Sequence, residues 1–264
     1  MRIVSVNAWG GAMLDELVGW LGGCGADVIC LQEVCRTPGA TGWVRFEDGD
    51  RSLPQRADLY GDLARALPDH QAFFVAFDSG PVRDEAGVVR RQHFGLATVV
   101  HPAVAVIGLE SAFIHGGYRD HLRWPTSNRP RAALAVRVAD PGSGHTVCVV
   151  QAHGLRDRAG KQDTPARDAQ AGRLAALADR AGADADLTVL CGDLNLLPDS
   201  RTFQVLATHG LTDLVGLADT RTSRYAKPIR HASYMLVSDP AAVRSFAVAA
   251  TPEVSDHRPL VLAL

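Results

Sequence analysis

The sequence has no hydrophobic run long enough to span a bilayer, and its first residues lead into a strand-like pattern without the apolar block of a signal peptide. It also lacks an excess of one charge, since 27 basic and 29 acidic residues give a formal net charge of −2. These absences argue against a membrane partner and against a global basic field for unspecific nucleic-acid binding. Local basic patches remain compatible with the composition.

Cysteine is scarce, and its count argues against a disulfide framework. Five cysteines, an odd number without regular spacing, favour reduced thiols and a cytoplasmic location. Cys24, Cys30, Cys148 and Cys191 lie among apolar or small residues and are predicted to belong to the core. No shift in composition marks a boundary, and 47% hydrophobic residues can bury a large core, so we expect one domain over residues 1–264.

The chain is organised around the stretch from Leu187 to Asp199. Its apolar run predicts a short buried strand that ends at Gly192 and is followed by two polar residues, Asp193 and Asn195. Residues two apart in an extended chain point the same way, so both side chains would face one spot. The carboxylate can ligate a hard cation or hold a water, and the amide can donate to a phosphate oxygen. A strand-ending Asx turn fits the same residues.

Four other strand-like runs end in, or lead to, a polar residue. The first ends at Asn7, the second at Glu33 and a later one at His153, while the C-terminal segment contains Asp256 and His257. A carboxylate that ends an apolar strand requires a cation or an arginine. We expect one end of a layered sheet to collect all these groups.

The remaining pattern predicts a mixed fold in which strands dominate. Helices are expected over 14–21, 59–67, 166–180 and 202–208, and long polar loops over 36–58 and 78–91. Strands over 94–100 and 103–109 are expected to pair with each other across His101-Pro102. These elements indicate an α/β or α+β sandwich.

The polar residues make a chemically consistent set. Glu33 and Asp256 are hard oxygen ligands of the type that Mg²⁺ or Mn²⁺ prefers, together with water and substrate phosphate. His153 and His257 lack cysteine ligands and a His-x-x-x-His spacing, and so fit acid/base or phosphate-binding roles better than a zinc site.

The chain resembles the endonuclease/exonuclease/phosphatase superfamily in three motifs and in their order. They are Leu-Gln-Glu ending at Glu33, Gly-Asp-Leu-Asn at 192–195 and Ser-Asp-His at 255–257. Together with Asn7 and His153, the resemblance runs over nearly the whole chain. It implies the DNase I-like fold: an α+β, four-layer α/β/β/α sandwich of two mostly antiparallel sheets flanked by helices, with the site at one rim of both sheets. It also implies a divalent-metal-dependent phosphoester hydrolase.

The resemblance assigns roles residue by residue. Glu33 would be the principal metal ligand and Asp256 would assist it, while Asn7 would contact the metal directly or support one of its ligands. Asp193 would orient or deprotonate the attacking water, and His257 would act as acid/base or transition-state donor. The remaining two, Asn195 and His153, would hold the scissile phosphate.

One position departs from the family pattern. The strand before the last motif usually carries an aspartate that pairs with the final histidine, whereas this chain has Ser233. A serine can hydrogen-bond His257 but supplies no charge, so we expect a less basic histidine. Either activity is reduced, in the extreme to a phosphate-binding pseudoenzyme, or a neighbour such as His231 or Asp239 substitutes.

The substrate is expected to be a soluble phosphoester, with a DNA or RNA nuclease as the alternative. The near-neutral charge weighs against an unspecific duplex binder. A compact anion pocket is expected from the basic residues at 119, 123, 129, 131, 156, 158 and 161, of which Arg131, Arg156 and Lys161 are the candidate substrate-binding residues.

Overall fold

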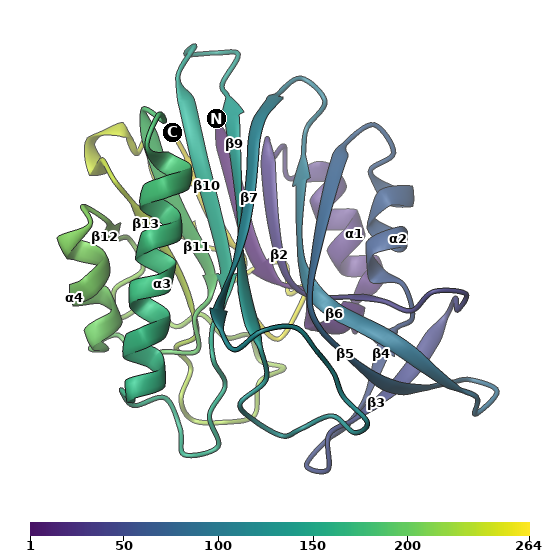
Figure 1. Ribbon diagram of the computed structural model, residues 1–264. Coiled ribbons are helices and arrows are strands. Elements are labelled where there is room, and N and C mark those ends of the chain that lie inside the picture. The colour runs from purple at the N-terminus through teal and green to yellow at the C-terminus, as the bar shows by residue number, and fades with distance from the viewer.

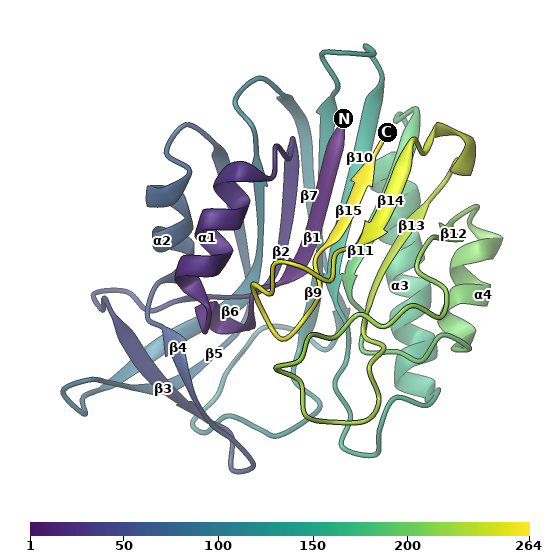
Figure 2. The ribbon, with the colours of Figure 1, turned by 180° about the vertical axis from the view of Figure 1, so that it is seen from behind.

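The computed structural model describes all residues from 1 to 264 and consists of two sheets packed face to face with helices outside both. Helices α3 (Pro165–Gly182) and α4 (Arg201–Thr208) cover one sheet, in front in Figure 1. Helices α1 (Leu14–Gly23) and α2 (Leu59–Ala66) cover the other, and α1 comes to the front in Figure 2. This is the α/β/β/α sandwich that the resemblance implies, so the predicted fold class is confirmed.

Both sheets are mostly antiparallel. The first follows the order β14 (Ser245–Val248), β15 (Leu260–Ala263), β1 (Arg2–Asn7), β2 (Val28–Arg36), β6 (Val89–Val100), β5 (Gln71–Asp84), β3 (Trp43–Glu47) and β4 (Ser52–Arg56), with β8 (Arg119–Asp120) beside β5. The second follows the order β12 (Thr212–Asp213), β13 (Ser233–Val237), β11 (Leu187–Asp193), β10 (Thr146–His153), β9 (Arg131–Ala139) and β7 (Ala105–His115).

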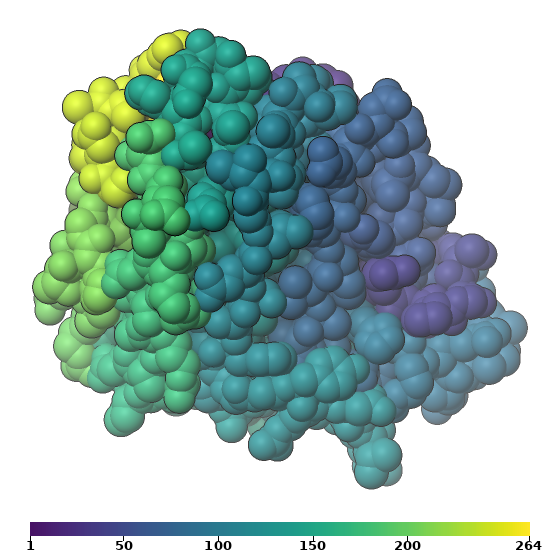
Figure 3. Space-filling model, turned by 45° about the horizontal axis from the view of Figure 1, so that its top comes forward, coloured from purple at the N-terminus to yellow at the C-terminus, as the bar shows by residue number.

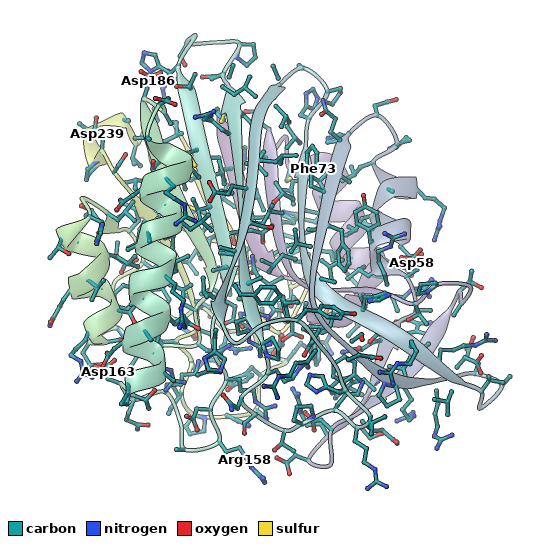
Figure 4. All side chains as sticks on the ribbon, in the orientation of Figure 1. Asp58, Phe73, Arg158, Asp163, Asp186 and Asp239 are labelled. Carbon is teal, nitrogen blue, oxygen red and sulfur yellow. The ribbon has the colours of Figure 1, made fainter.

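Each sheet contains one long parallel pair near its centre. Strand β1 runs parallel to β2, with Asn7 opposite Gln32, and β10 runs parallel to β11, with His153 opposite Asp193. Parallel neighbours place their carboxyl ends at the same edge of a sheet. The ends of these four strands therefore lie at one rim, the lower one in Figure 1, and both termini lie at the upper end. Figure 4 places Arg158 near the lower rim and Asp186 at the opposite end.

The sequence of the central strands explains their position. Strands β10 and β11 are buried along almost their whole length because they are covered on both faces, which is why they read as continuous apolar runs. A cluster of 45 buried residues fills the space between the sheets and under α3, and a second cluster of 15 lies beneath α1 and α2. In the space-filling view the green residues of α3 and α4 lie beside the yellow C-terminal residues, and the blue residues of α2 and β5 lie on the other side (Figure 3).

Two expected loops contain strands, so those predictions were wrong. Residues 36–58 include the β3–β4 hairpin, in which Val44 and Phe46 are buried while Arg45 and Glu47 are exposed. The proline and arginine content obscured this short alternation. Residues 78–91 are mostly strand, because β5 continues to Asp84 and β6 begins at Val89.

The expected pairing of 94–100 with 103–109 was also wrong. Strand β6 pairs with β2 and β5, whereas β7 lies in the other sheet beside β9. The turn at His101-Pro102 therefore connects the two sheets instead of closing a hairpin. Strands that are close in sequence usually pair, which favours a hairpin. Only the packing of the two sheets shows that this connection crosses from one sheet to the other.

The expected core cysteines are buried with one exception. Cys30, Cys148 and Cys191 are buried, whereas Cys24 at the end of α1 is only partly covered. None of the helices combines the length and apolar character that crossing a membrane requires.

A close approach of two backbones at Gly192 gives a test of the fold. A Cβ atom there would lie 2.0 Å from the Ala152 carbonyl oxygen, and the residue has φ of 135°. We expect Gly192→Ala to lower the free energy of unfolding by about 2–4 kcal/mol, measured by urea denaturation, because clash and backbone strain add. Gly172→Ala, at an exposed position in α3 with open space around it, should instead raise stability by about 0.5–1 kcal/mol. Equal effects of the two changes would contradict the close approach.

Candidate functional site

Glu33 reaches the rim through an irregularity in β2. The ladder to β6 shifts register between Gln32 and Val34, and Glu33 has a φ of 57°. Left-handed backbone is uncommon for a residue with a side chain, and a bulge re-aims that side chain out of the regular alternation. The carboxylate of Glu33, 22% exposed, consequently lines a cleft at the rim instead of the core.

Asp193 ends β11 and is held by two donors. The Asn7 side-chain amide donates to Oδ2 at 3.0 Å, and the backbone N–H of Asn195 donates to Oδ1 at 3.1 Å. Asn7 is itself fixed, because its Oδ1 accepts from the Trp9 backbone N–H at 2.9 Å. These bonds join the carboxyl ends of β1 and β11, which belong to different sheets.

His153 completes a group of three potential metal ligands. Its Nε2 lies 3.9 Å from Glu33 Oε1 and 3.8 Å from Asp193 Oδ2, and one ligand atom of each of the three residues lies within 4.8 Å of the others. The ring is almost fully buried, and burial together with Arg131 and Arg129 holds its pKa well below the usual range. A neutral imidazole can offer a lone pair to a cation.

His257 faces the same carboxylate from the last loop. Ser233 Oγ lies 2.8 Å from Nδ1, and Nε2 lies 3.4 Å from Asp193 Oδ2. If the Ser233 hydroxyl donates to Nδ1, the ring proton lies on Nε2 and points at the Asp193 carboxylate, which is favourable. The opposite tautomer would direct the Nε2 lone pair at that carboxylate. Burial, followed by Arg221, lowers the pKa of His257 well below the ordinary value.

Neither proposed substitute for the missing aspartate reaches this histidine. His231 Nδ1 lies 3.2 Å from the Ala218 carbonyl oxygen, and Asp239 caps the 3-10 helix Pro240–Ala242 through the backbone N–H of Ala241. Ser233 is therefore the hydrogen-bond partner of the His257 Nδ1 atom.

Asp256 lies beside the cluster but has an arginine partner. Arg221 Nη1 donates to its Oδ2 at 2.7 Å, and burial raises the pKa of Asp256 to about 7 although Arg221 opposes the shift. The sequence predicts that Asp256 assists the metal, but it does not predict Arg221 as its partner. The arginine comes from a polar loop whose packing against Asp256 has no signature in the chain.

Asn195 is placed by the turn that follows β11. Its φ is 56°, and its side-chain Nδ2 lies 3.4 Å from the Gly154 carbonyl oxygen. The turn passes so close to the next strand end that a Cβ atom at Gly154 would meet the Leu194 carbonyl oxygen at 2.1 Å. Gly154 and Gly192 both lie where the ends of β10 and β11 meet, and neither position has room for a Cβ atom.

One cleft of about 570 Å³ with a strongly basic wall is lined by most of these groups: Glu33, His153, Asp193, Asn195, Arg221, Asp256 and His257. Asn7 and Ser233 are not part of its lining. Its five carboxylates are those of Glu33, Asp50, Asp157, Asp193 and Asp256, and its ten basic residues are Arg51, Arg129, Arg131, Arg156, Arg158, Lys161, Arg167, Arg221, Arg224 and Lys227. Lined in this way, the cleft attracts anions even though the whole chain carries a net charge of −2.

The three candidate substrate-binding residues all line the cleft. Arg131 donates to the Gly154 carbonyl oxygen at 2.8 Å, and burial lowers its pKa to about 10. Lys161 donates to the His231 carbonyl oxygen, and burial lowers its pKa to about 8. Arg156 lies 3.5 Å from Asp48 in the β3–β4 turn. Of the other expected members of the anion pocket, Arg119 and Arg123 lie outside the cleft.

Arg129 is the best-fixed cation of the wall. Its guanidinium makes two bonds of 2.7 and 2.8 Å to the buried Asp78. It also stacks on Trp124 and Phe94, whose ring centres lie 4.3 and 4.4 Å from its Cζ atom. Planar stacking and a bidentate carboxylate suit arginine and not lysine. The sequence indicates an arginine-rich segment here but not this partner, which is 51 residues away.

Comparison with known proteins agrees with this geometry. The sequence profile of the endonuclease/exonuclease/phosphatase family matches residues 4–257. The chain belongs to this family. Its members are typically phosphoester hydrolases and generally use divalent metals. No curated protein matches the sequence significantly.

Solved structures of low sequence identity share the fold. A mannosyl-6-phosphatase from Bacteroides thetaiotaomicron superposes with a TM-score of 0.70 at 13% identity, over 100% of this chain and 98% of that one. The human Nocturnin catalytic domain with bound sulfate gives 0.63 at 17%, over 99% and 92%. TDP2 from D. rerio, complexed with a single-strand DNA product, gives 0.61 at 15%, over 99% and 97%.

The buried pair of Asp78 and Arg129 gives a test of the wall. We expect Asp78→Asn to lower the free energy of unfolding by about 3–5 kcal/mol in urea denaturation, because it leaves the buried guanidinium without a countercharge. The matched control is Glu110→Gln, which removes the surface partner of Arg180 and should cost less than about 1 kcal/mol. If the two variants lose the same stability, Asp78 does not hold Arg129 as described.

Proposed function

We propose that this protein is a divalent-metal-dependent hydrolase of a soluble, anionic phosphoester. The observation that carries the proposal is the convergence of Glu33, His153 and Asp193 within 4.8 Å of one another, inside a cleft with ten basic side chains. Carboxylates beside so many cations are the combination that binds a metal and a phosphate together. The family membership supports the same reaction class.

The donor set fits a hard divalent cation. Two carboxylates and one imidazole match Mg²⁺ or Mn²⁺, with Mn²⁺ the more tolerant of nitrogen. Glu33 and Asp193 would hold the ion, with His153 at its edge and Asn7 fixing Asp193; Asp256 would assist. When bound, the ion would neutralise charge on the phosphate and lower the pKa of a water.

Asp193 and His257 are the proposed proton-handling pair. Asp193 would orient and deprotonate the attacking water, since the Asn7 amide and the Asn195 N–H hold its two oxygens in place. His257, with a proton on Nε2, would donate to the phosphoryl oxygens as charge develops in the in-line displacement. No covalent intermediate with the protein is required.

The remaining groups are proposed to position the phosphate. The Asn195 amide would contact its non-bridging oxygens, while Arg131, Arg156 and Lys161 supply charge along the wall. Because these cations lie in a cleft and not on an open face, we favour a small molecule over duplex DNA. The alternative, a nuclease, is supported by the single-strand DNA bound to the similarly folded TDP2.

Removal of Glu33 tests the reaction class. In a panel of phosphodiesters, phosphomonoesters and plasmid DNA, we expect turnover by the wild type with Mg²⁺ or Mn²⁺ and background with EDTA. Glu33→Ala should lower kcat/KM by at least about a hundredfold, because it removes the principal proposed metal ligand. Glu110→Ala, a carboxylate on the outer surface, is the control and should retain full activity.

The panel also separates the alternatives. Turnover of plasmid DNA with a steep dependence of binding on salt would indicate a nuclease, because each phosphate contact releases counterions. Metal-dependent turnover that survives Glu33→Ala, or turnover that is unaffected by EDTA, would contradict the proposed site.

Substitution of Ser233 tests the missing charge. We expect Ser233→Asp to raise the turnover number by about tenfold, because a charge-assisted bond to Nδ1 strengthens His257 as a donor to the transition state. Ser233→Ala should lower it, since Nδ1 loses its only hydrogen-bond partner. Initial rates under saturating substrate measure both effects.

The same pair of variants distinguishes an enzyme from a pseudoenzyme. Background turnover in the wild type together with turnover in Ser233→Asp would mean that the serine has switched the chemistry off. A Ser233→Asp variant slower than the wild type would contradict the role given to this position.

A further inference from the structure

Trp9 has a backbone conformation that a bulky residue rarely adopts. Its φ is 50°, and Gly10 and Gly11 follow with φ of 61° and 77°. Such strain persists only where the surroundings impose it, and it concentrates at ligand-binding sites. At Trp9 the Asn7 side chain imposes it from one side, by accepting the Trp9 N–H at 2.9 Å.

Strand β4 fixes the same turn from the other side. A Cβ atom at Gly10 would lie 2.7 Å from Gln55 Cγ, and one at Gly11 would lie 2.5 Å from Arg56 Cγ. The two glycines therefore let the 3-10 turn Trp9–Gly11 press directly against β4. Clamped in this way, the turn holds the Trp9 side chain in one place.

Trp9 has no structural role of the kind that the other tryptophans have. Trp124 is buried in the main core and donates to the Pro81 carbonyl oxygen, and Trp20 packs on the core under α1 and α2. Trp43 stacks with Arg56. The indole of Trp9 belongs to neither core cluster, and the hydrogen bond that Trp9 donates comes from its backbone N–H and not from the ring. The strain thus places an aromatic ring where it does not stabilise the core.

Trp9 lines both the cleft and a second cavity. This cavity, of about 400 Å³, shares Trp9, Leu53, Gln55 and Arg224 with the cleft. It adds Ala12, Met13, Glu16 and Pro54, so it is far less basic than the cleft itself. A molecule whose phosphate lies among the arginines would extend its other end over Trp9 into this space.

We propose that Trp9 is a stacking platform for a planar ring carried by the substrate, and that the second cavity is the subsite for that ring. The inference rests on the proposed function, because it presumes a phosphate in the cleft. The substrate class is then a phosphoester of an aromatic or heterocyclic alcohol or nucleoside. Arg224, whose Nε lies 3.7 Å from Glu253, supplies a cation at the edge of the same space.

The bond from Asn7 gives the platform a fixed relation to the chemistry. Asn7 donates to Asp193 with its Nδ2 and accepts from Trp9 with its Oδ1, so one side chain joins the carboxylate proposed to activate the water to the turn that carries the ring. A flexible loop could not impose such a relation. Trp9 is a specificity-determining residue in this arrangement, and it takes no part in bond cleavage.

Calorimetric titration of two ligands with the same phosphate and sugar tests the platform. Adenosine 5′-monophosphate and ribose 5-phosphate differ only by the planar base, and EDTA suppresses turnover. We expect the wild type to bind the nucleotide about five- to a hundredfold more tightly, the range that stacking on an aromatic side chain provides. Trp9→Ala should bring the ratio of the two dissociation constants close to one, and Trp9→Phe should keep most of it.

Controls separate the platform from the phosphate site. Trp43→Ala removes a tryptophan outside both cavities and should leave the ratio unchanged, and thermal denaturation verifies that each variant is folded. Equal affinity of the wild type for both ligands would overturn the platform and leave the proposed function standing. An equal loss of affinity for both ligands in Trp9→Ala would do the same. If neither ligand binds in EDTA and neither binds when Mg²⁺ is supplied, the phosphate site is overturned as well. Phenyl phosphate, as a third ligand, distinguishes a general aromatic ring from a nucleobase.

Discussion

The meeting of two parallel strand pairs from different sheets is the constraint on which the rest of this protein depends. Strands β1 and β2 in one sheet and β10 and β11 in the other end at the same rim. The polar residues at these strand ends are thereby brought to one place, where loops add the remaining groups. The cost is that several carboxylates and imidazoles are desolvated together, and the network from Trp9 through Asn7 and Asp193 to Asn195 offsets it with hydrogen bonds.

Charge in the cleft is balanced locally and not over the whole surface. Asp78 neutralises Arg129 and Asp256 pairs with Arg221, so the buried guanidinium groups are fixed before any ligand arrives. A fixed cation loses little conformational freedom when an anion binds, which favours preorganised recognition of a phosphate. The low overall charge and the basic cleft are therefore compatible.

The sequence predicts the rim better than it predicts its walls. His153 and Asp193 end apolar strands as predicted, whereas Glu33 lies in a bulge of β2, which continues to Arg36. The motif order nevertheless identifies the three residues that meet at the rim. Arg221 and Trp9 come from turns whose course depends on distant contacts, that of Arg221 with Asp256 and that of the Trp9 turn with β4, so no local pattern marks them. The β3–β4 hairpin was missed for a related reason, because its strands have five residues each and contain proline and arginine.

The pairing of β1 with β15 places the first and last strands of the chain side by side, with Ser5 opposite Leu260. The Ser255 hydroxyl donates to the Asn7 carbonyl oxygen at 2.6 Å, across 248 residues. Contacts of such sequence separation slow folding, since a long stretch of chain must be ordered before they form. During synthesis on the ribosome, the rim would therefore be completed only when the C-terminal strand has emerged, and a partly made chain would be unable to close the site around a phosphate.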